Sequence, residues 1–169
     1  VDADGMLTAQ GGGTEWNFNS GNDGWTFSNS YSGRVTTPAC AYNGSTAGSI
    51  RTYAGSTYAT SPIVDLSGAT NMPLHAWIRQ GSSGCGEEPD SNENLAVQYR
   101  NNAGGWTTLQ TWQGSTSGGG VTQYAVNLPS AAFHSSFQVR FHQNSGSGTC
   151  CDYWFFDDVK LAAPLQASW

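Results

Sequence analysis

Apolar and polar residues alternate with a period of two in three segments of the chain. Segment 72–80 (MPLHAWIRQ) places Leu74, Ala76 and Ile78 on one face and His75, Trp77 and Arg79 on the other. Segment 94–100 (NLAVQYR) places Leu95, Val97 and Tyr99 opposite Ala96, Gln98 and Arg100. Segment 137–143 (FQVRFHQ) places Phe137, Val139 and Phe141 opposite Gln138, Arg140 and His142. This period predicts β-strands with one face on a core.

Shorter runs with the same character, separated by turn sequences, predict further strands at 14–19, 24–28, 48–53, 60–65, 105–112, 121–128 and 153–161. The turn NNAGGW predicts a hairpin between the strands on either side of it. The one helix-like patch is PSAAFH at 129–134. About ten short strands indicate an all-β, two-sheet antiparallel sandwich, most simply a jelly roll.

The chain has 169 residues, which suits one domain. We expect a single jelly-roll domain over 1–169, with its core at about 14–161 and a peripheral head and tail. The first residues, VDADGMLTAQGGG, show no signal peptide and look like the start of a processed or excised fragment.

The charge balance limits the classes of partner that the protein can bind. The formal net charge is −6, so phosphate backbones and anionic membrane surfaces are repelled. No apolar run of about 18 residues is present to span a bilayer. We therefore expect no nucleic acid and no membrane insertion. A single lysine among many Ser, Thr, Asn and aromatic residues resembles secreted bacterial modules, which favours a secreted or cell-surface location.

The four cysteines are Cys40, Cys85, Cys150 and Cys151. They form no C-x-x-C pair, and no histidine stands at zinc-finger spacing, so a structural zinc site is disfavoured. Two disulfides suit an exported protein. Adjacent cysteines rarely bond each other, so we expect Cys40 and Cys85 each to pair with one of the other two. The alternative is one or two free, buried thiols.

Seven of the 12 acidic residues fall in EEPDSNE (87–93) and CCDYWFFDD (150–158). Converging carboxylates repel one another unless they are protonated or bridged by a cation, and extracellular Ca²⁺ takes 6–8 oxygen ligands. We expect a structural Ca²⁺ site with ligands drawn from Glu88, Asp90, Glu93, Asp152 and Asp158. The alternative is two solvated acidic loops plus one capping aspartate.

Three of the six basic residues lie on polar strand faces beside His, Gln and Trp. If the strands are neighbours, they form a platform that stacks a sugar ring and binds its hydroxyls or carboxylates. The expected ligand-binding residues are His75, Trp77, Arg79, Gln98, Arg100, Arg140 and His142. The alternative is a solvent-facing sheet whose arginines pair with nearby acids.

Trp25 and Trp106 open strands after turns and are expected to cap the core, whereas Tyr31, Tyr53 and Tyr58 are candidates for a sugar-binding loop.

Catalytic signatures are weak. Neither G-x-S-x-G nor H-E-x-x-H occurs. Asp157 and Asp158 should point to opposite sides of a strand, which excludes them as an acid–base couple. Glu93 with Asp152 could span a glycosidic bond, but acid-rich loops bind calcium more often. We therefore assign no catalytic residues.

Three stretches resemble the MAM-like and reelin-repeat-like jelly rolls: WNFNSGNDGWTFS as opening strands, ENLAVQYRNNAGGWTTLQTWQG as central hairpin, and LPSAAFHSSFQVRFHQ with DYWFFDDVKL as closing strands. Together they extend over about 150 residues, from 16 to 161. The resemblance implies a two-sheet jelly roll, frequently with Ca²⁺ held by the acidic loop and the closing aspartates. It also implies neighbouring domains in a larger adhesin or secreted enzyme. The acid of the opening F-E-S-G pattern is replaced here by Asn19, which would weaken a site that depends on it.

We therefore expect a non-catalytic, secreted module that recognises a polysaccharide or surface glycan and is stabilised by calcium and disulfides. One alternative is a small β-sandwich glycosidase or polysaccharide lyase. The other is a structural interaction domain of a larger adhesin or protease.

Overall fold

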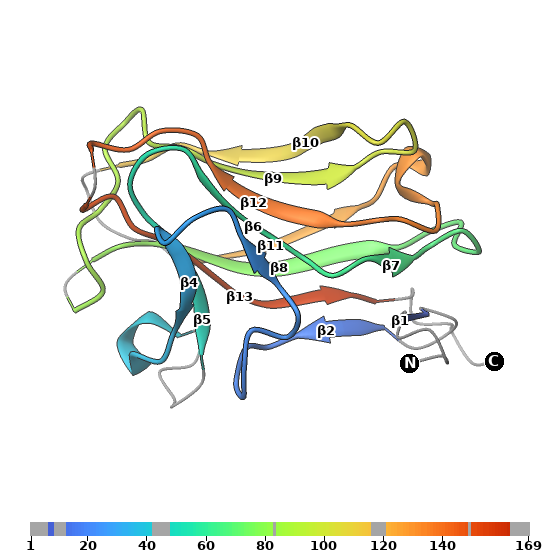
Figure 1. Ribbon diagram of the computed structural model, residues 1–169, viewed down its shortest axis with the longest axis horizontal. Coiled ribbons are helices and arrows are strands. Elements are labelled where there is room, and N and C mark those ends of the chain that lie inside the picture. The colour runs from blue at the N-terminus through green and yellow to red at the C-terminus, as the bar shows by residue number, and fades with distance from the viewer. Residues whose placement is uncertain are drawn as a thin grey trace.

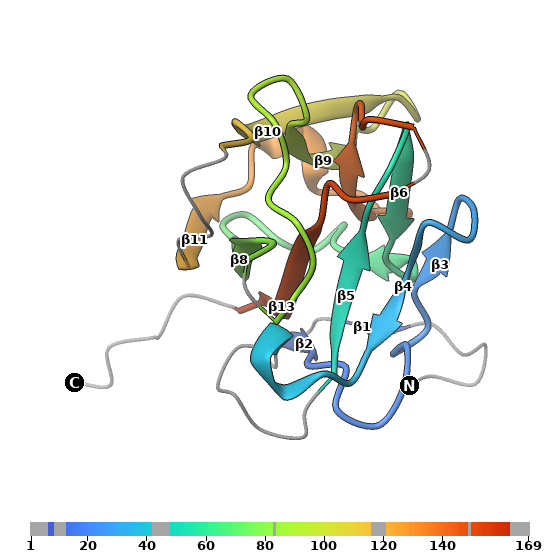
Figure 2. The same cartoon turned by 90° about the vertical axis from the view of Figure 1, so that its left-hand side faces the viewer.

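The computed structural model describes residues 7–8, 13–41, 48–82, 84–115, 121–148 and 150–162. Two antiparallel sheets pack face to face (Figure 1), and the end-on view in Figure 2 shows both layers. No helix in these ranges is long and apolar enough to cross a membrane.

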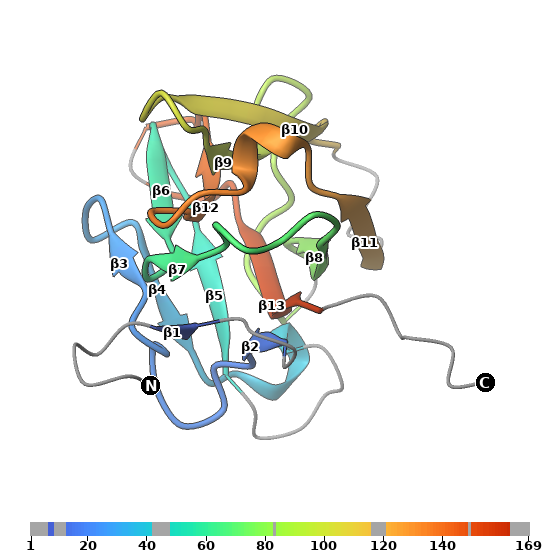
Figure 3. The ribbon, with the colours of Figure 1, turned by 90° about the vertical axis from the view of Figure 1, so that its right-hand side faces the viewer.

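The five-stranded sheet follows the order β10 (Trp106–Trp112), β9 (Leu95–Arg100), β12 (Val139–Gln143), β6 (Thr57–Thr60) and β3 (Thr26–Phe27). The six-stranded sheet follows the order β11 (Val121–Asn127), β8 (Pro73–Gln80), β13 (Trp154–Leu161), β5 (Ser49–Thr52) and β4 (Ser32–Val35), and its sixth strand, β2 (Thr14–Trp16), pairs with β13. A short parallel pair joins β1 (Leu7–Thr8) to β7 (Val64–Asp65), as Figure 3 shows. Two 3₁₀ turns, η1 (Pro38–Cys40) and η2 (Ser130–Ala132), complete the structure.

This architecture confirms the all-β sandwich. The three period-two segments form β8, β9 and β12, and the predicted hairpin joins β9 to β10. The helix-like patch is the single turn η2. The predicted strand 60–65 is displaced to β6 and β7, and β4 was not predicted. Residues before 14 and after 161 lie mostly outside the described ranges.

The core between the sheets is rich in aromatic rings. Phe141 of the five-stranded sheet stacks on Phe156 of the six-stranded sheet, with ring centroids 3.9 Å apart and planes within 11°. Trp25 packs beside both rings, at 5.9 Å and 5.3 Å. Its exposed fraction is 3%, so the prediction that Trp25 caps the core is confirmed. These contacts bury apolar surface from both layers, which is the main favourable term in the stability of a sandwich.

Strand β13 contains a bulge that changes which of its side chains face the core. The pairing with β8 shifts between Asp157 and Lys160, and Asp158 has a φ of 44°. Phe156 before the bulge and Val159 after it can therefore both point inward. Strict alternation back from Val159 would point Phe155 inward, but with the bulge it packs with Cys40 and Cys85 on the outer side of the six-stranded sheet.

All four cysteines form disulfides, but the predicted pairing is wrong. Cys40 bonds Cys85 across 45 residues, and Cys150 bonds its neighbour Cys151. Cys151 has a φ of 95°, in the left-handed region, and this backbone geometry accompanies the bond between adjacent residues. The long-range disulfide thus fixes η1 to the turn after β8, and the vicinal disulfide closes a local loop before β13.

Candidate functional site

The seven residues predicted to form one ligand platform lie on two different sheets. Gln98, Arg100, Arg140 and His142 belong to β9 and β12 of the five-stranded sheet, whereas His75, Trp77 and Arg79 belong to β8 of the six-stranded sheet. Each set faces away from the core, because the alternate residues of each strand fill it. The two sets therefore occupy opposite outer surfaces of the sandwich, and a single platform is excluded.

The outer surface of the five-stranded sheet carries a cluster of aromatic and polar side chains. We call it the Arg140 face and define it by Tyr58, Gln98, Trp106, Arg140 and His142. Register brings these residues together. Gln98 lies directly opposite Arg140 in the β9–β12 pair, and His142 lies opposite Tyr58 in the β12–β6 pair. Residues paired in this way on one face of an antiparallel sheet have Cβ atoms about 5 Å apart.

Arg140 is the centre of this face. Its guanidinium carbon lies 4.3 Å from the ring centroid of Trp106 and 5.0 Å from that of Tyr58. Its Nε donates a 2.6 Å hydrogen bond to Oε1 of Gln98. Partial burial lowers the pKa of Arg140 from its ordinary value, against a smaller opposing effect of Tyr58. An arginine so held stays charged, because its ordinary pKa is far above neutrality, and it offers its remaining N–H groups in a fixed direction.

His142 extends the face beside Tyr58. The two rings meet edge to face, with centroids 5.6 Å apart, and Nε2 of His142 lies 3.0 Å from the hydroxyl of Ser56. Burial lowers the pKa of His142, and the nearby charge of Arg140 lowers it further. The neutral imidazole, which is favoured at neutral pH, has one donor and one acceptor nitrogen.

Trp106 was not among the predicted ligand-binding residues. It was expected to cap the core, which is wrong: it is the first residue of β10, and its half-buried ring lies against Arg140 on the outer surface. The hairpin places Trp106 opposite Arg100. That register could have been read from the sequence, because a residue paired with a polar-face residue shares its face.

Arg100 lies on the same sheet, but its side chain contacts Gln138, which is outside the Arg140 face. Its Nη1 lies 3.4 Å from Oε1 of Gln138, and the amide nitrogen of Gln138 donates to the carbonyl of Ser61. This chain of side-chain hydrogen bonds connects β9, the residue before β12 and the segment after β6. Arg100 therefore lies at the margin of the Arg140 face.

The predicted residues of β8 form no open aromatic surface. The exposed fraction of Trp77 is 3%, so its ring cannot stack on a ligand. Arg79 donates to the hydroxyl of Ser82 at 2.7 Å, and burial lowers its pKa. The outer face around β8 therefore offers no counterpart of the Arg140 face.

The two acidic clusters meet, but through a single pair of buried carboxyl groups. The exposed fractions of Glu93 and Asp152 are 5% and 3%, and the two side chains hydrogen-bond each other. Glu93 also accepts from the hydroxyl of Ser147 at 2.6 Å and from the backbone N–H of Asp90 at 2.7 Å. Asp152 accepts from the backbone N–H of Ser147 at 2.6 Å. Nearly every oxygen of the pair thus has a partner from the protein.

A carboxyl pair at hydrogen-bonding distance requires one shared proton. Burial, together with the neighbouring Glu93, raises the pKa of Asp152 to about 6. Burial also acts to raise the pKa of Glu93, but hydrogen bonds from Asp152 and Ser147 outweigh it and the net pKa is lowered. Below about pH 6, Asp152 is therefore the donor and Glu93 the acceptor. A directly bonded pair leaves no space for a sugar or water between its oxygens, which does not suit a glycosidase couple.

The remaining predicted calcium ligands do not join this pair. Glu88 is half-buried, and Asp90 is exposed and offers its backbone N–H to Glu93. Asp158 lies at the bulge of β13 and donates its backbone N–H to Asp157. Within the described ranges, no three His, Cys, Asp or Glu side chains are grouped to hold a metal ion. The carbonyl oxygen of Asn19 accepts from Arg34 at 2.8 Å. Calcium binding stays a prediction.

Solved structures share this fold at low sequence identity. The CBM22-1–GH10 modules of xylanase Xyn10B from Clostridium thermocellum, complexed with xylohexaose, match at 12% identity and a TM-score of 0.60, over 89% of this chain and 28% of that chain. TmCBM61 in complex with β-1,4-galactotriose matches at 13% identity and a TM-score of 0.54, over 86% of this chain and 97% of that chain. The K3 cleaved adhesin domain of Lys-gingipain from Porphyromonas gingivalis matches at 16% identity and a TM-score of 0.52, over 89% and 98%.

No curated protein matches the sequence significantly. A family model described as Reelin subrepeat B matches residues 33–162, which include both sheets from β4 to β13. This match covers well over half of the chain and agrees with the resemblance seen in the hairpin and closing strands. The chain belongs to the Reelin subrepeat B family.

Proposed function

We propose that the protein is a carbohydrate-binding module that holds a polysaccharide on the Arg140 face. The observation that carries the proposal is the position of the Arg140 guanidinium between Trp106 and Tyr58, with its Nε fixed by Gln98. The face therefore presents a charge held in a fixed position between two aromatic rings.

The chemistry of the face suits a sugar chain. A pyranose presents C–H groups on its faces, which pack on aromatic rings, and hydroxyl groups on its edge, which need directed donors and acceptors. Trp106 and Tyr58 supply the rings, and Tyr58 is 36% exposed. Arg140, Gln98 and His142 supply the polar groups between them. The strands run side by side here, so the cluster is long enough to contact more than one sugar residue.

Similar solved structures and the disulfides both support the proposal. Two of the similar structures were solved with xylohexaose or β-1,4-galactotriose bound, and the third is an adhesin domain. The disulfides favour an oxidising, extracellular location, where such polysaccharides occur. We therefore propose a secreted or cell-surface module that acts beside other domains of a larger protein.

Affinity electrophoresis in gels that contain xylan or β-1,4-galactan tests the proposal. We expect at least one polysaccharide to retard the protein, and Arg140→Ala to weaken that binding at least tenfold. The matched control is Arg79→Ala, which removes the same charge from the opposite sheet and should bind as the wild type does. Equal retardation of wild type and Arg140→Ala would refute the site. Release of reducing ends from either polysaccharide would instead favour an enzyme.

Calcium stabilisation is a separate part of the proposal, supported by the family resemblance and by the meeting of the two acidic loops. A ligand that binds only the folded state raises the melting temperature. We expect the melting temperature to fall by several degrees when a chelator is added and to recover with excess Ca²⁺. An unchanged melting temperature would show that calcium does not stabilise this protein.

A further inference from the structure

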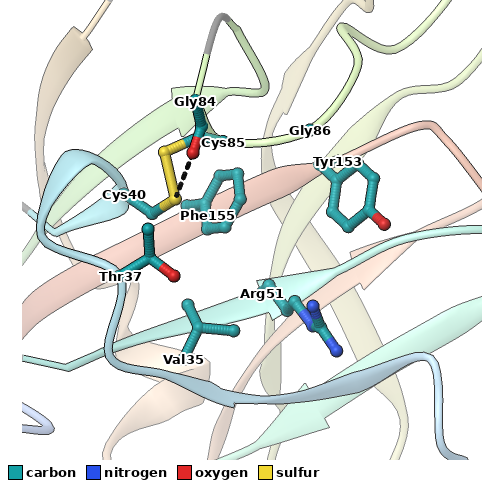
Figure 4. Close-up of a pocket in the computed structure, with 9 residues that line it drawn as sticks. All are labelled: Val35, Thr37, Cys40, Arg51, Gly84, Cys85, Gly86, Tyr153 and Phe155. Atoms are coloured by element: carbon teal, nitrogen blue, oxygen red, sulfur yellow. Dashed lines mark hydrogen bonds between the residues drawn. A yellow bond between two sulfur atoms is a disulfide. The ribbon is translucent and has the colours of Figure 1, made fainter.

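A cavity of about 160 Å³ lies on the outer side of the six-stranded sheet, away from the Arg140 face. Strands β4, β5 and β13 and the turn at Cys85 surround it (Figure 4). Within the sheet, Phe155 lies directly opposite Arg51, and Arg51 lies opposite Gly33. A Cβ atom at Gly33 would meet nothing within 4 Å, so this row of the sheet is open beside Arg51.

The wall of the cavity is fixed by covalent and backbone contacts. The Cys40–Cys85 disulfide joins η1 to the turn at 84–86. The backbone N–H of Gly81 donates to the carbonyl of Tyr153 at 2.7 Å, and the N–H of Tyr153 donates to the carbonyl of Glu87 at 3.2 Å. Gly86 has a φ of 82°, and a Cβ atom there would collide with the ring of Tyr153. The cavity is therefore formed before any ligand arrives, which lowers the entropic cost of binding.

The cavity has an apolar floor and a polar rim. Phe155 and the disulfide form the floor, and their residues are each at most 4% exposed. Thr37, Arg51 and Tyr153 stand around the rim in Figure 4, with the Thr37 hydroxyl directed toward the centre. Of the nine described lining residues, Arg51 alone carries a charge. A ligand with an apolar face and a polar, anionic edge complements this arrangement.

Arg51 is oriented but not neutralised. Its guanidinium carbon lies 4.7 Å from the ring centroid of Tyr53 and 6.0 Å from that of Tyr153. Those two tyrosines stack on each other, with centroids 4.9 Å apart and planes within 20°. In the described part of the chain, the guanidinium has no carboxylate or hydrogen-bond acceptor. Its N–H groups remain available for a carboxylate, which arginine binds through two parallel hydrogen bonds.

The volume limits the ligand to about one ring, since an apolar protein cavity of about 150 Å³ binds benzene. A pyranose combines C–H groups for the floor with hydroxyl groups for Thr37 and Tyr153. A carboxylate on that ring would reach Arg51. We propose that this cavity is a second ligand site, which binds one pyranose ring bearing a carboxylate, that is, a uronate. The site is independent of the Arg140 face and does not require the function proposed for it.

Two probes that differ only in the carboxylate test this assignment: methyl β-glucuronide and methyl β-glucoside. Titrations of the ¹⁵N-labelled protein are followed by amide chemical shifts. We expect the glucuronide to shift the amides of Cys85, Gly86 and Tyr153 and to bind at least tenfold more tightly than the glucoside. Shifts confined to the Arg140 face, or no shifts at all, would overturn the site.

Two variants test the charge of Arg51 and the open volume of the cavity separately. Arg51→Gln should reduce glucuronide binding to the level of the glucoside while the remaining spectrum stays folded. Val35→Phe should fill the cavity and abolish binding of both probes with Arg51 still present. The control Arg140→Gln should leave the cavity unaffected, so failure of this site and failure of the Arg140 face give different results. Undiminished glucuronide binding by either cavity variant would refute the proposal.

A third probe distinguishes a sugar from a peptide-like acid. N-acetylphenylalanine carries a carboxylate and a flat ring but no sugar hydroxyls. We expect it to bind more weakly than the glucuronide, because it leaves the hydroxyls of Thr37 and Tyr153 without partners from the ligand. Tighter binding of N-acetylphenylalanine would overturn the assignment to a uronate.

Discussion

Replacing Asp152 with asparagine should remove most of the dependence of stability on pH between pH 5 and pH 8. Asp152 shares a proton with Glu93 in the folded protein, and its pKa is raised from the ordinary 3.8 to about 6. The folded state therefore binds this proton more tightly than the unfolded chain does. The resulting stability is complete below pH 3.8 and is lost as the pH rises through about 6.

The size of the contribution of Asp152 to stability follows from its two pKa values, ordinary and raised. A tenfold change in proton affinity is worth about 1.4 kcal/mol. The difference between 3.8 and about 6 therefore corresponds to about 3 kcal/mol, which is an upper limit. About 1.4 kcal/mol of it is still present at pH 5 and almost none at pH 8. Glu93 acts in the opposite sense: its pKa is lowered, so its contribution is present above the ordinary 4.5 and is lost only at lower pH.

Asparagine reproduces the protonated form at every pH. Its amide nitrogen can donate to Glu93 as the carboxyl proton does, and its oxygen can still accept from the backbone N–H of Ser147. Both proteins carry His142→Gln, because the lowered pKa of His142 would otherwise add stability as the pH rises through the same range. In that background we expect the free energy of unfolding to fall by about 1.4 kcal/mol from pH 5 to pH 8 when Asp152 is present. With Asp152→Asn we expect a change of less than about 0.5 kcal/mol.

Urea denaturation in the presence of a chelator measures both values. The control is Asp65→Asn, which alters a carboxylate whose pKa is lowered by hydrogen bonds from Ser67 and should retain the fall expected with Asp152 present. With His142 replaced, a stability of the Asp152-containing protein that is constant or rises from pH 5 to pH 8 would show that the pair shares no proton. An equal fall in Asp152→Asn would show that another group is responsible. Recovery of stability at pH 8 with Ca²⁺ would indicate that the cation replaces the shared proton.

Three further predictions concern stability. Replacing Cys40 and Cys85 together with serine should lower the free energy of unfolding by about 4 kcal/mol, from the entropy of closing a loop across 45 residues, as measured by urea denaturation; a loss below about 1 kcal/mol would contradict this. Tyr124→Phe should raise the melting temperature, because the buried Tyr124 hydroxyl has no hydrogen-bond partner among the described residues, and a marked decrease would show that a partner exists. Lys160→Ala should change stability by less than about 0.5 kcal/mol, because its 3.8 Å ion pair with Glu15 is exposed.

Side-chain periodicity predicted which face of each strand meets the core, but it could not assign strands to sheets. Val97 and Phe141 face inward as their alternation required. Trp77 and Arg140 were grouped because each stands on the non-core face of its strand. Pairing between strands distant in sequence decides which faces share a surface, and it put β8 and β12 in different sheets. A period of two holds no information on that pairing.

Local irregularities of the backbone and sequence account for the other differences between the structure and the expectations from sequence. The direction of Phe155 depends on the bulge that follows it in β13, and such a bulge needs only one extra residue in the strand. Strand β4 has the sequence SGRV, whose single large apolar residue gives no alternation to detect. The bond between Cys150 and Cys151 was not expected because adjacent cysteines rarely bond each other, yet the backbone of Cys151 adopts the left-handed conformation that accompanies it.

Strand β13 pairs with β8 on one edge and with β5 and β2 on the other, so it occupies the middle of the six-stranded sheet. It is also the last strand in chain order among the described residues. A ribosome therefore releases β2, β5 and β8 before the strand that joins them exists. Until then their edges and core-facing side chains are open to chaperones, proteases and other chains. We expect cooperative folding to begin only after residue 161 has left the exit tunnel. Folding should then be slow, because it depends on pairing between strands that are distant in sequence.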